Sequence, residues 1–295
     1  MTTIPSVRPV TGFRLLLAAG AGAAALALAG HAAAADCAGA GVITRIEGDP
    51  AAVSIVRAGA KVARPRVLEV VCTGDRVSAA GATRITLSLD GRGAVQVNAS
   101  TPYVVAARGG APSLAGNAYR AVNDQVMPDM KRLPWDVRLK GGDTGFNFAL
   151  PQLAAGGQEL SAGSRALLLR VEGGAGPYSA TLTGPAGAVA QAQGAGDLVF
   201  PAVNFTPGRY HVTARDAAGA TIQADFTVSA SPGALPTTYD SLTDPEVRAA
   251  ATACALARAA SDKRALEAEQ LLAAAPTNGL DRTRVYDLIE SYGTN

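Results

Sequence analysis

Few side chains in this chain are of the types that catalyse reactions or hold metals. The sequence contains two histidines, His31 near the N-terminus and His211. A nucleophilic serine or cysteine needs a neighbouring base, most often histidine, and a zinc site needs several Cys or His ligands at short spacing. The sequence has no Gly-x-Ser-x-Gly turn, no phosphate-binding loop and no His-Glu-x-x-His stretch. We therefore expect no enzymatic activity, no cofactor and no metal.

His211 falls within a predicted strand over residues 209–215. Side chains alternate between the two faces of a strand, so Tyr210 and Val212 share one face and His211 lies on the other. We expect His211 to face solvent, without a catalytic or metal-binding role.

Asp143-Thr144-Gly145 has the sequence of the triplet that supplies a catalytic carboxylate in aspartic proteases. That chemistry needs two carboxylates sharing a proton, so a homodimer would have to supply the second copy. Lys140-Gly141-Gly142 stands where an apolar strand leads into such a motif. We interpret the triplet as a loop.

The three cysteines differ in their surroundings. Cys37 lies near the start of the mature chain and Cys72 ends the apolar run 67–72. We predict a Cys37–Cys72 disulfide, which would contribute about 3–4 kcal/mol by constraining the unfolded chain. Cys254 lies between two alanines in a predicted helix. We interpret it as a small buried apolar residue, with a reactive or intermolecular thiol as the alternative.

The first 35 residues have the features of a cleaved secretory signal. A positively charged start precedes the small, apolar residues 15–30, and Ala33-Ala34-Ala35 offers a signal-peptidase site. Cleavage near Ala35 predicts a periplasmic or secreted protein without stable membrane insertion afterwards. Cys37 makes a lipoprotein the alternative, but Asp36 is charged where lipidation signals carry a small residue.

Charge and composition restrict the partners and the fold. The chain has 26 basic and 24 acidic residues, and removal of the leader takes away Arg8 and Arg14, leaving 24 of each. Binding of nucleic acid would require a clustered basic excess, so we expect none. The 33 glycines, 17 prolines and 5% aromatic residues are typical of many short strands joined by tight turns.

Residues 36–108 predict a small all-β domain. The clearest strand, 84–89, places Ile85, Leu87 and Leu89 on one face. Asp90-Gly91-Arg92-Gly93 then turns the chain into a second strand with Val95 and Val97, because glycine supplies the positive φ of a short turn.

This segment resembles the FecR-like periplasmic domain. The resemblance rests on the order of Gly41-Val42, Val56-Arg57-x-Gly59, residues 71–77 (Val-Cys-Thr-Gly-Asp-Arg-Val) and Leu87-Ser88-Leu89-Asp90-Gly91. It covers about 65 residues and implies a β-rich, non-catalytic module that senses or binds a partner in the bacterial envelope. A cleavable signal precedes the domain here, so the resemblance is to a soluble relative. We interpret Gly74-Asp75 as a turn in which the carboxylate accepts backbone amides.

Residues 109–140 predict a linker with one short helix. Tyr119, Val122 and Val126 recur at helical spacing between residues 114 and 127, and we expect Pro128 to end the helix. Trp135, the only tryptophan, is a possible interaction residue. We expect it to pack between the two β modules, with stacking on a sugar ring as the alternative.

Residues 141–230 predict a β-sandwich. Turn signals recur every 8–12 residues between candidate strands at 146–150, 166–171, 178–183, 189–191, 198–200, 209–215 and 221–228. In the last pair, Tyr210 and Val212 share a face that meets Ala224 and Phe226. This hairpin resembles the final strands of bacterial immunoglobulin-like or fibronectin-type modules.

Residues 231–295 predict a linker and a helical tail. Asp244 caps a first helix with Pro245 at its first position, Ser261 or Asp262 caps a second, and Asp281 opens a third. So short a helical segment must dock on another surface, and we expect its own chain to provide it, with docking on a partner as the alternative.

The sequence thus predicts a mainly β, exported, non-enzymatic envelope protein that binds another envelope protein or senses a signal. Binding of envelope polysaccharide or peptidoglycan is the alternative. It would require exposed aromatic side chains in a groove, which the low aromatic content disfavours.

Overall fold

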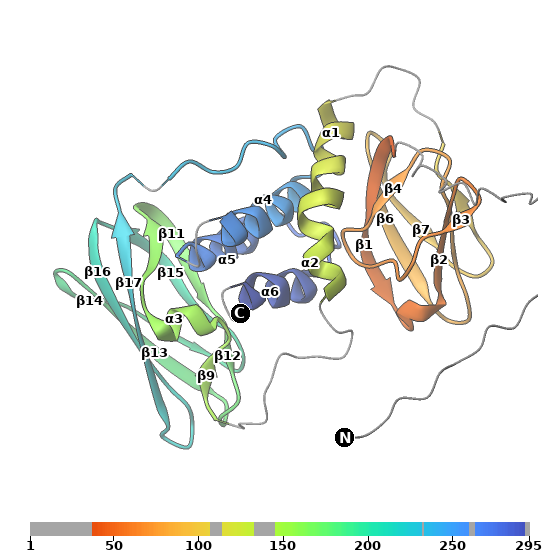
Figure 1. The fold of residues 1–295 in the computed structure, drawn as a ribbon. Coiled ribbons are helices and arrows are strands. Elements are labelled where there is room, and N and C mark those ends of the chain that lie inside the picture. The colour runs from red at the N-terminus through yellow and green to blue at the C-terminus, as the bar shows by residue number, and fades with distance from the viewer. Residues whose placement is uncertain (1–36, 107–113, 133–144, 232, 260–262, 293–295) are drawn as a thin grey trace, which may run out of the picture. The chain divides into compact units, whose positions relative to one another are not determined.

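The protein is mainly β, with several antiparallel sheets and a short C-terminal helical segment, as predicted (Figure 1). A computed structural model describes residues 37–106, 114–132, 145–231, 233–259 and 263–292. The predicted signal peptide, Trp135 and Asp143-Thr144 lie outside the described residues.

The N-terminal module consists of two four-stranded sheets, in the orders β4-β1-β6-β7 and β3-β2-β5-β8 (Figure 1). Side chains from both sheets form one core, which includes Ile43, Ile85 and Leu87 from the first and Ile55 and Val77 from the second. The strands are β1 (Gly39–Glu47), β2 (Val53–Arg57), β3 (Ala60–Lys61), β4 (Val70–Cys72), β5 (Arg76–Ala79), β6 (Arg84–Leu89), β7 (Gly93–Val97) and β8 (Tyr103–Val104), with a 3₁₀ turn at Pro50–Ala52. The predicted β6–β7 hairpin is confirmed, with Leu87 opposite Val95.

Strands β1 and β4 are buried on both faces, which explains their continuous apolar runs. Ile43 and Val71 point into the core between the two sheets. Val42 and Val70 belong to a second core, which also holds Tyr119 and Val122.

A helix covers this second face and runs further than predicted. It comprises α1 (Leu114–Ala121), a π-helical turn (Val122–Val126) and α2 (Met127–Arg132). The expectation that Pro128 ends the helix is therefore wrong. The Met127 N–H bonds to the carbonyl of Val122, five residues earlier, and this wider turn admits a proline that would disrupt a regular α-helix.

Gly39 in β1 lets α1 lie close to the sheet. A Cβ at this position would be 2.6 Å from the Cβ of Tyr119. The helix is also held by Arg66, whose Nη1 donates to the carbonyl of Met130 over 2.6 Å. Residues 114–132 thus form part of the core, within the segment expected to be a linker.

The C-terminal β module contains a five-stranded sheet in the order β10-β17-β16-β13-β14 and the pairs β11-β15 and β12-β9. Its elements are β9 (Asn147–Phe148), α3 (Pro151–Ala155), β10 (Gln158–Ser161), β11 (Gly163–Leu169), β12 (Val171–Glu172), β13 (Tyr178–Gly184), β14 (Gly187–Gly194), β15 (Leu198–Phe205), β16 (Gly208–Arg215) and β17 (Thr221–Ser229).

The β16–β17 hairpin has the predicted register, with Tyr210 opposite Phe226 and Val212 opposite Ala224. Strand β10 was not predicted. It has only one large apolar residue, Leu160, so its sequence shows no strand pattern. It pairs in parallel with β17, a strand that lies much later in the chain.

Three helices, α4 (Pro245–Ala259), α5 (Ala265–Ala274) and α6 (Arg282–Ser291), follow the β module (Figure 1). Their apolar side chains share one core with the strands of the second module, which confirms that they dock on their own chain. The predicted cap at Ser261 or Asp262 is wrong, because α5 begins at Ala265. The amide of Leu266 in its first turn donates to Gln158 Oε1 of β10, so a tertiary contact replaces a local cap.

Candidate functional site

The two cysteines of the N-terminal module form a disulfide. Cys37 and Cys72 are bonded, with their Cα atoms 5.3 Å apart. Cys72 ends β4 and lies opposite Gly39 of β1, so the bond ties the residues before β1 to the neighbouring strand.

Cys254 is enclosed in the helical core. It has no solvent exposure, and burial raises the pKa of its thiol to about 12. A thiol held in its neutral form is a poor nucleophile. The interpretation as a small buried apolar residue is confirmed.

An ion pair with a buried carboxylate, Asp75, joins the Arg-x-Gly hairpin to the Gly-Asp turn. Arg57 Nη2 lies 2.9 Å from Asp75 Oδ2, and Arg57 Nε lies 3.1 Å and 3.2 Å from the two carboxylate oxygens. Asp75 also accepts the backbone amide of Cys72 over 2.8 Å, as the turn interpretation predicted. The ion pair was not predicted, although its two residues stand in the pattern that resembles FecR-like domains.

Replacing Asp75 with asparagine is expected to lower the free energy of unfolding by about 2 kcal/mol. Asparagine can still accept the Cys72 amide but cannot pair with a guanidinium through two charged oxygens. Urea unfolding of Asp75→Asn, Arg57→Met and the double variant measures the coupling. If the loss of unfolding free energy in the double variant equals the sum of the losses in the two single variants, the interaction between Arg57 and Asp75 contributes nothing to stability.

A groove of about 620 Å³ lies between the β11–β15 pair and helices α5 and α6. Its strand side is formed by Ser164, Arg165, Ala166, Leu168 and Val199, and its helix side by Glu267, Gln270, Leu271, Ala274, Arg282 and Tyr286. Leu235, which follows β17, completes the lining. Val199 is 55% exposed and Leu235 43% exposed, so two large apolar side chains meet water at one place. Exposed apolar side chains that gather in a concave site are typical of binding surfaces.

One edge of β11 opens into this groove. Strand β15 pairs with the other edge of β11. This pairing contains a bulge, because two residues of β15, Pro201 and Ala202, lie opposite a single residue of β11, Ala166. At Leu168 the open edge is covered by Gln270, whose side chain accepts the Leu168 amide over 2.7 Å and donates to its carbonyl over 2.9 Å. Residues at alternate positions direct their amide groups to the same side of a strand. Ser164 and Ala166, which are exposed, therefore present backbone groups to the groove.

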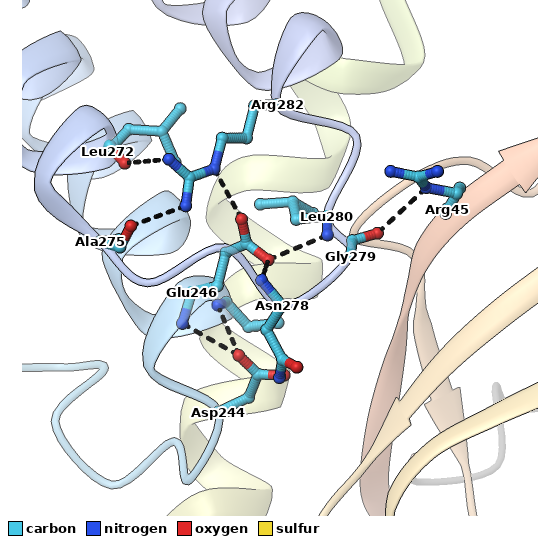
Figure 2. A network of polar contacts seen from close by, with 10 residues as sticks. Arg45, Asp244, Glu246, Leu272, Ala275, Asn278, Gly279, Leu280 and Arg282 are labelled. Atoms are coloured by element: carbon cyan, nitrogen blue, oxygen red, sulfur yellow. Dashed lines mark hydrogen bonds and ion pairs between the residues drawn. The ribbon is translucent and has the colours of Figure 1, made fainter.

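The helix wall of the groove is held by a buried carboxylate (Figure 2). Glu246 is 1% exposed; it accepts the amides of Asn278 and Leu280 over 2.6 Å and 2.9 Å and binds Arg282 Nε over 2.6 Å. Arg282 in turn donates to the carbonyls of Leu272 and Ala275 at the end of α5. Glu246 thus fixes the end of α5, the following loop and the start of α6 together.

Both the loop between α5 and α6 and the residue that precedes α4, Asp244, contact the N-terminal module. Asp244 caps α4, as predicted, by accepting the amides of Glu246 and Val247, and its second oxygen accepts from Ser88 of β6 over 2.7 Å. The Asp281 amide donates to the carbonyl of Thr44 in β1. Arg45 Nε lies 3.4 Å from the carbonyl of Gly279 (Figure 2). The groove wall is therefore tied to β1 and β6.

His211 lies on the outer face of β16, as predicted. Its Nδ1 is 3.0 Å from Asp225 Oδ1 and its Nε2 is 3.1 Å from Thr213 Oγ1. The strand register accounts for these contacts, because His211 lies opposite Asp225 and two residues from Thr213. Hydrogen bonds from His211 and Arg209 lower the pKa of Asp225. The connectivity is that of a nucleophile, base and acid. His211, Asp225 and Arg209 also line a pocket of about 470 Å³ beside Gly156 and Gly157, and the side chains of His211 and Asp225 are about 40% exposed.

The described part of the chain offers neither a metal site nor a membrane-crossing helix. No three side chains of His, Cys, Asp or Glu gather there in a way that could hold a metal ion. None of the described helices combines the length and the apolar character of a membrane-crossing helix.

Sequence reasoning missed the groove because its walls come from segments about a hundred residues apart, such as Leu168 and Gln270, which are separated by 102 positions. One signal was present. Glu267, Glu269 and Gln270 interrupt an otherwise apolar helix, and all three are buried. Buried polar side chains require partners, so such a cluster indicates tertiary polar contacts.

Comparisons with known proteins identify no family. No family model and no curated protein matches the sequence. A crystal structure of CopC from Methylosinus trichosporium OB3b is similar over 25% of this chain and 84% of CopC, at 24% identity and a TM-score of 0.22. SGBP-B from the Bacteroides ovatus mixed-linkage glucan utilization locus, in complex with a mixed-linkage heptasaccharide, is 14% identical, with a TM-score of 0.21. That similarity covers 63% of this chain and 41% of SGBP-B, so the chain spans less than half of that protein. These TM-scores are too low to carry a conclusion about function.

Proposed function

We propose that this protein is an exported, non-enzymatic interaction module that binds an extended segment of another envelope protein in the groove between β11 and α5. The observation that carries the proposal is the open edge of β11 at Ser164 and Ala166 beside the exposed side chains of Val199 and Leu235.

An extended peptide fits both features of the groove. Its backbone can pair with backbone groups of β11 at Ser164 and Ala166, which are exposed and line the groove, and alternate side chains can enter the apolar space. Gln270 already pairs with Leu168 in this way, which limits the pairing to the part of β11 before Leu168.

We also propose that the N-terminal module is FecR-like and that it takes part in sensing. Two observations support this. The Arg57–Asp75 contact joins two elements of the sequence pattern, and the loop between α5 and α6 connects the groove wall to β1. A change at the groove would therefore reach β1 through directly bonded residues.

Binding of a polysaccharide receives less support from the geometry. Sugar rings stack on exposed aromatic faces, whereas Tyr286, the aromatic residue of the groove lining, is 8% exposed and has Arg170 over its ring.

Substituting a charge into the groove is expected to abolish binding. Val199→Glu and Leu235→Glu place a carboxylate where a partner would bury apolar side chains, and we expect each to weaken capture of the partner about tenfold or more. Because both residues are exposed, the fold should tolerate the change. Crosslinking of the tagged protein in its own envelope, followed by mass spectrometry, measures the capture.

The chain offers matched controls for this experiment. Val104 and Val189 are 60% and 39% exposed and do not line the groove. Val104→Glu and Val189→Glu should leave capture unchanged. Equal capture by groove and control variants would refute the groove as the binding site, and capture of glycan alone would favour the polysaccharide alternative.

A further inference from the structure

Two buried carboxyl groups meet where α5 and α6 pack on the second β module. Glu269 of α5 is 1% exposed and Glu290 of α6 is 6% exposed, and their side chains are hydrogen-bonded to each other. Glu290 also forms an ion pair with Arg170, which lies between β11 and β12. The Oε1 atom of Glu269 has no hydrogen-bond partner among the described residues.

The charges around this pair do not balance if both carboxyl groups are ionised. Arg170 forms an ion pair with Glu290, and its charge also acts on Glu269. The other charged or titratable groups that act on Glu269 or on the adjoining Tyr286 are Asp197, between β14 and β15, and Arg282. A hydrogen bond between two carboxyl groups requires a proton on one of them. Burial raises the pKa of Glu269 to about 8, whereas the charge of Arg170 and the hydrogen bond with Glu290 oppose this rise.

This cluster borders the groove. Arg170 lies over the ring of Tyr286, 4.7 Å from its centroid, and Tyr286 lines the groove. Glu269 stands between Glu267 and Gln270 of α5, whose side chains hold Ser161 and Leu168. The contacts that shape the groove and the contacts of the carboxyl pair therefore belong to the same two helices.

We propose that Glu269 and Glu290 form a proton-dependent latch: one shared proton keeps α5 and α6 packed on the β module, and its loss loosens both helices and weakens binding in the groove. The binding part rests on the proposed function, whereas the latch itself can be tested without a partner.

The direction of the pH effect follows from the raised pKa. In the unfolded chain Glu269 has the ordinary pKa of glutamic acid, about 4.3. The folded state therefore binds one more proton between that pH and about 8. The stabilisation is fully present below the unfolded pKa and decreases as the pH rises through the folded pKa.

The first test compares the full chain with Glu269→Gln, which keeps a hydrogen-bond donor but cannot ionise. The unfolding equilibrium constant of the wild type, divided by that of Glu269→Gln, is expected to rise about tenfold per pH unit between pH 5 and pH 8 and to level off above pH 8. Such a rise means that the wild type loses stability relative to the variant as the pH increases. Glu47→Gln, which changes an exposed carboxylate in β1, should show a constant ratio. Parallel curves for the wild type and Glu269→Gln would overturn the latch.

A second variant, Glu290→Gln, tests the latch independently in case Glu269→Gln does not fold. In Glu290→Gln, Glu269 becomes the carboxylate available to Arg170, so its pKa should fall and the pH dependence should move to lower pH. An unchanged pH dependence in this variant would also contradict the latch.

Hydrogen exchange locates the effect and separates it from the proposed function. At pH 9, amides of α5 and α6 should exchange at least tenfold faster in the wild type than in Glu269→Gln, while those of β6 should be equal. Partner capture by the wild type should decrease between pH 7 and pH 9, and capture by Glu269→Gln should not. A confirmed exchange difference with capture unaffected by Leu235→Glu would refute the proposed function and leave the latch standing.

Discussion

Replacing Glu246 with alanine is expected to lower the free energy of unfolding by about 4 kcal/mol. The substitution leaves the amides of Asn278 and Leu280 without their acceptor and the partly buried Arg282 guanidinium without its carboxylate. Urea unfolding monitored by circular dichroism measures the loss.

The effect should begin at the groove wall. Arg282 binds the carbonyls of Leu272 and Ala275, so without Glu246 the end of α5 and the following loop lose their common anchor. Amide exchange in residues 272–282 should therefore accelerate more than exchange in β16 and β17, which lie outside this network.

Glu47→Ala is the matched control for Glu246→Ala. Glu47 is also a glutamate paired with an arginine, Arg45, but both side chains are about half exposed and 3.4 Å apart. Its removal should change stability by less than about 0.5 kcal/mol. A loss below about 1 kcal/mol for Glu246→Ala would contradict the role assigned to this network.

Removing the Cys37–Cys72 disulfide is expected to cost about 4 kcal/mol, because the bond closes a loop over a sequence separation of 35 residues. For a chain of this size the loss corresponds to a decrease of roughly 10 °C in the unfolding temperature. The variant Cys37→Ala/Cys72→Ala, compared with the wild type by calorimetry, measures it.

A reductant provides the control for the disulfide. Dithiothreitol should lower the unfolding temperature of the wild type and leave that of the double variant unchanged. Cys254 should not interfere, because its thiol is fully buried and its pKa is raised. Equal unfolding temperatures with and without reductant would show that the bond contributes nothing to stability.

Features that depend on neighbouring residues were predictable from the sequence. The β6–β7 hairpin follows from the alternation of Ile85, Leu87 and Leu89 and from the glycines of the turn. Asp244 and Pro245 mark the start of α4 because a side-chain acceptor and a fixed φ act within one helical turn. His211 was placed on the outer face of its strand for a similarly local reason.

The continuation of the helix past Pro128 was decided by tertiary structure. A proline predicts a helix end because it lacks an N–H and its ring crowds the preceding turn. Here the helix buries Val122, Val126 and Met127 in the core that strands β1 and β4 share with the C-terminal helices, and the π-helical turn makes room for the proline. Burial of one whole helix face outweighs a local preference of a few kcal/mol.

The groove and the carboxyl pair were also decided by tertiary structure. Spacing along α5 shows that Glu267, Glu269 and Gln270 are polar, but not that Arg165, Leu168 and Glu290 are their partners. The sequence by itself determined the mainly β fold and the start of α4, because short-range geometry sets them, and it indicated the Cys37–Cys72 disulfide through the positions of the two cysteines. Packing between segments about a hundred residues apart decided which polar residues are buried, and that burial gives Glu269 its raised pKa and the groove its walls.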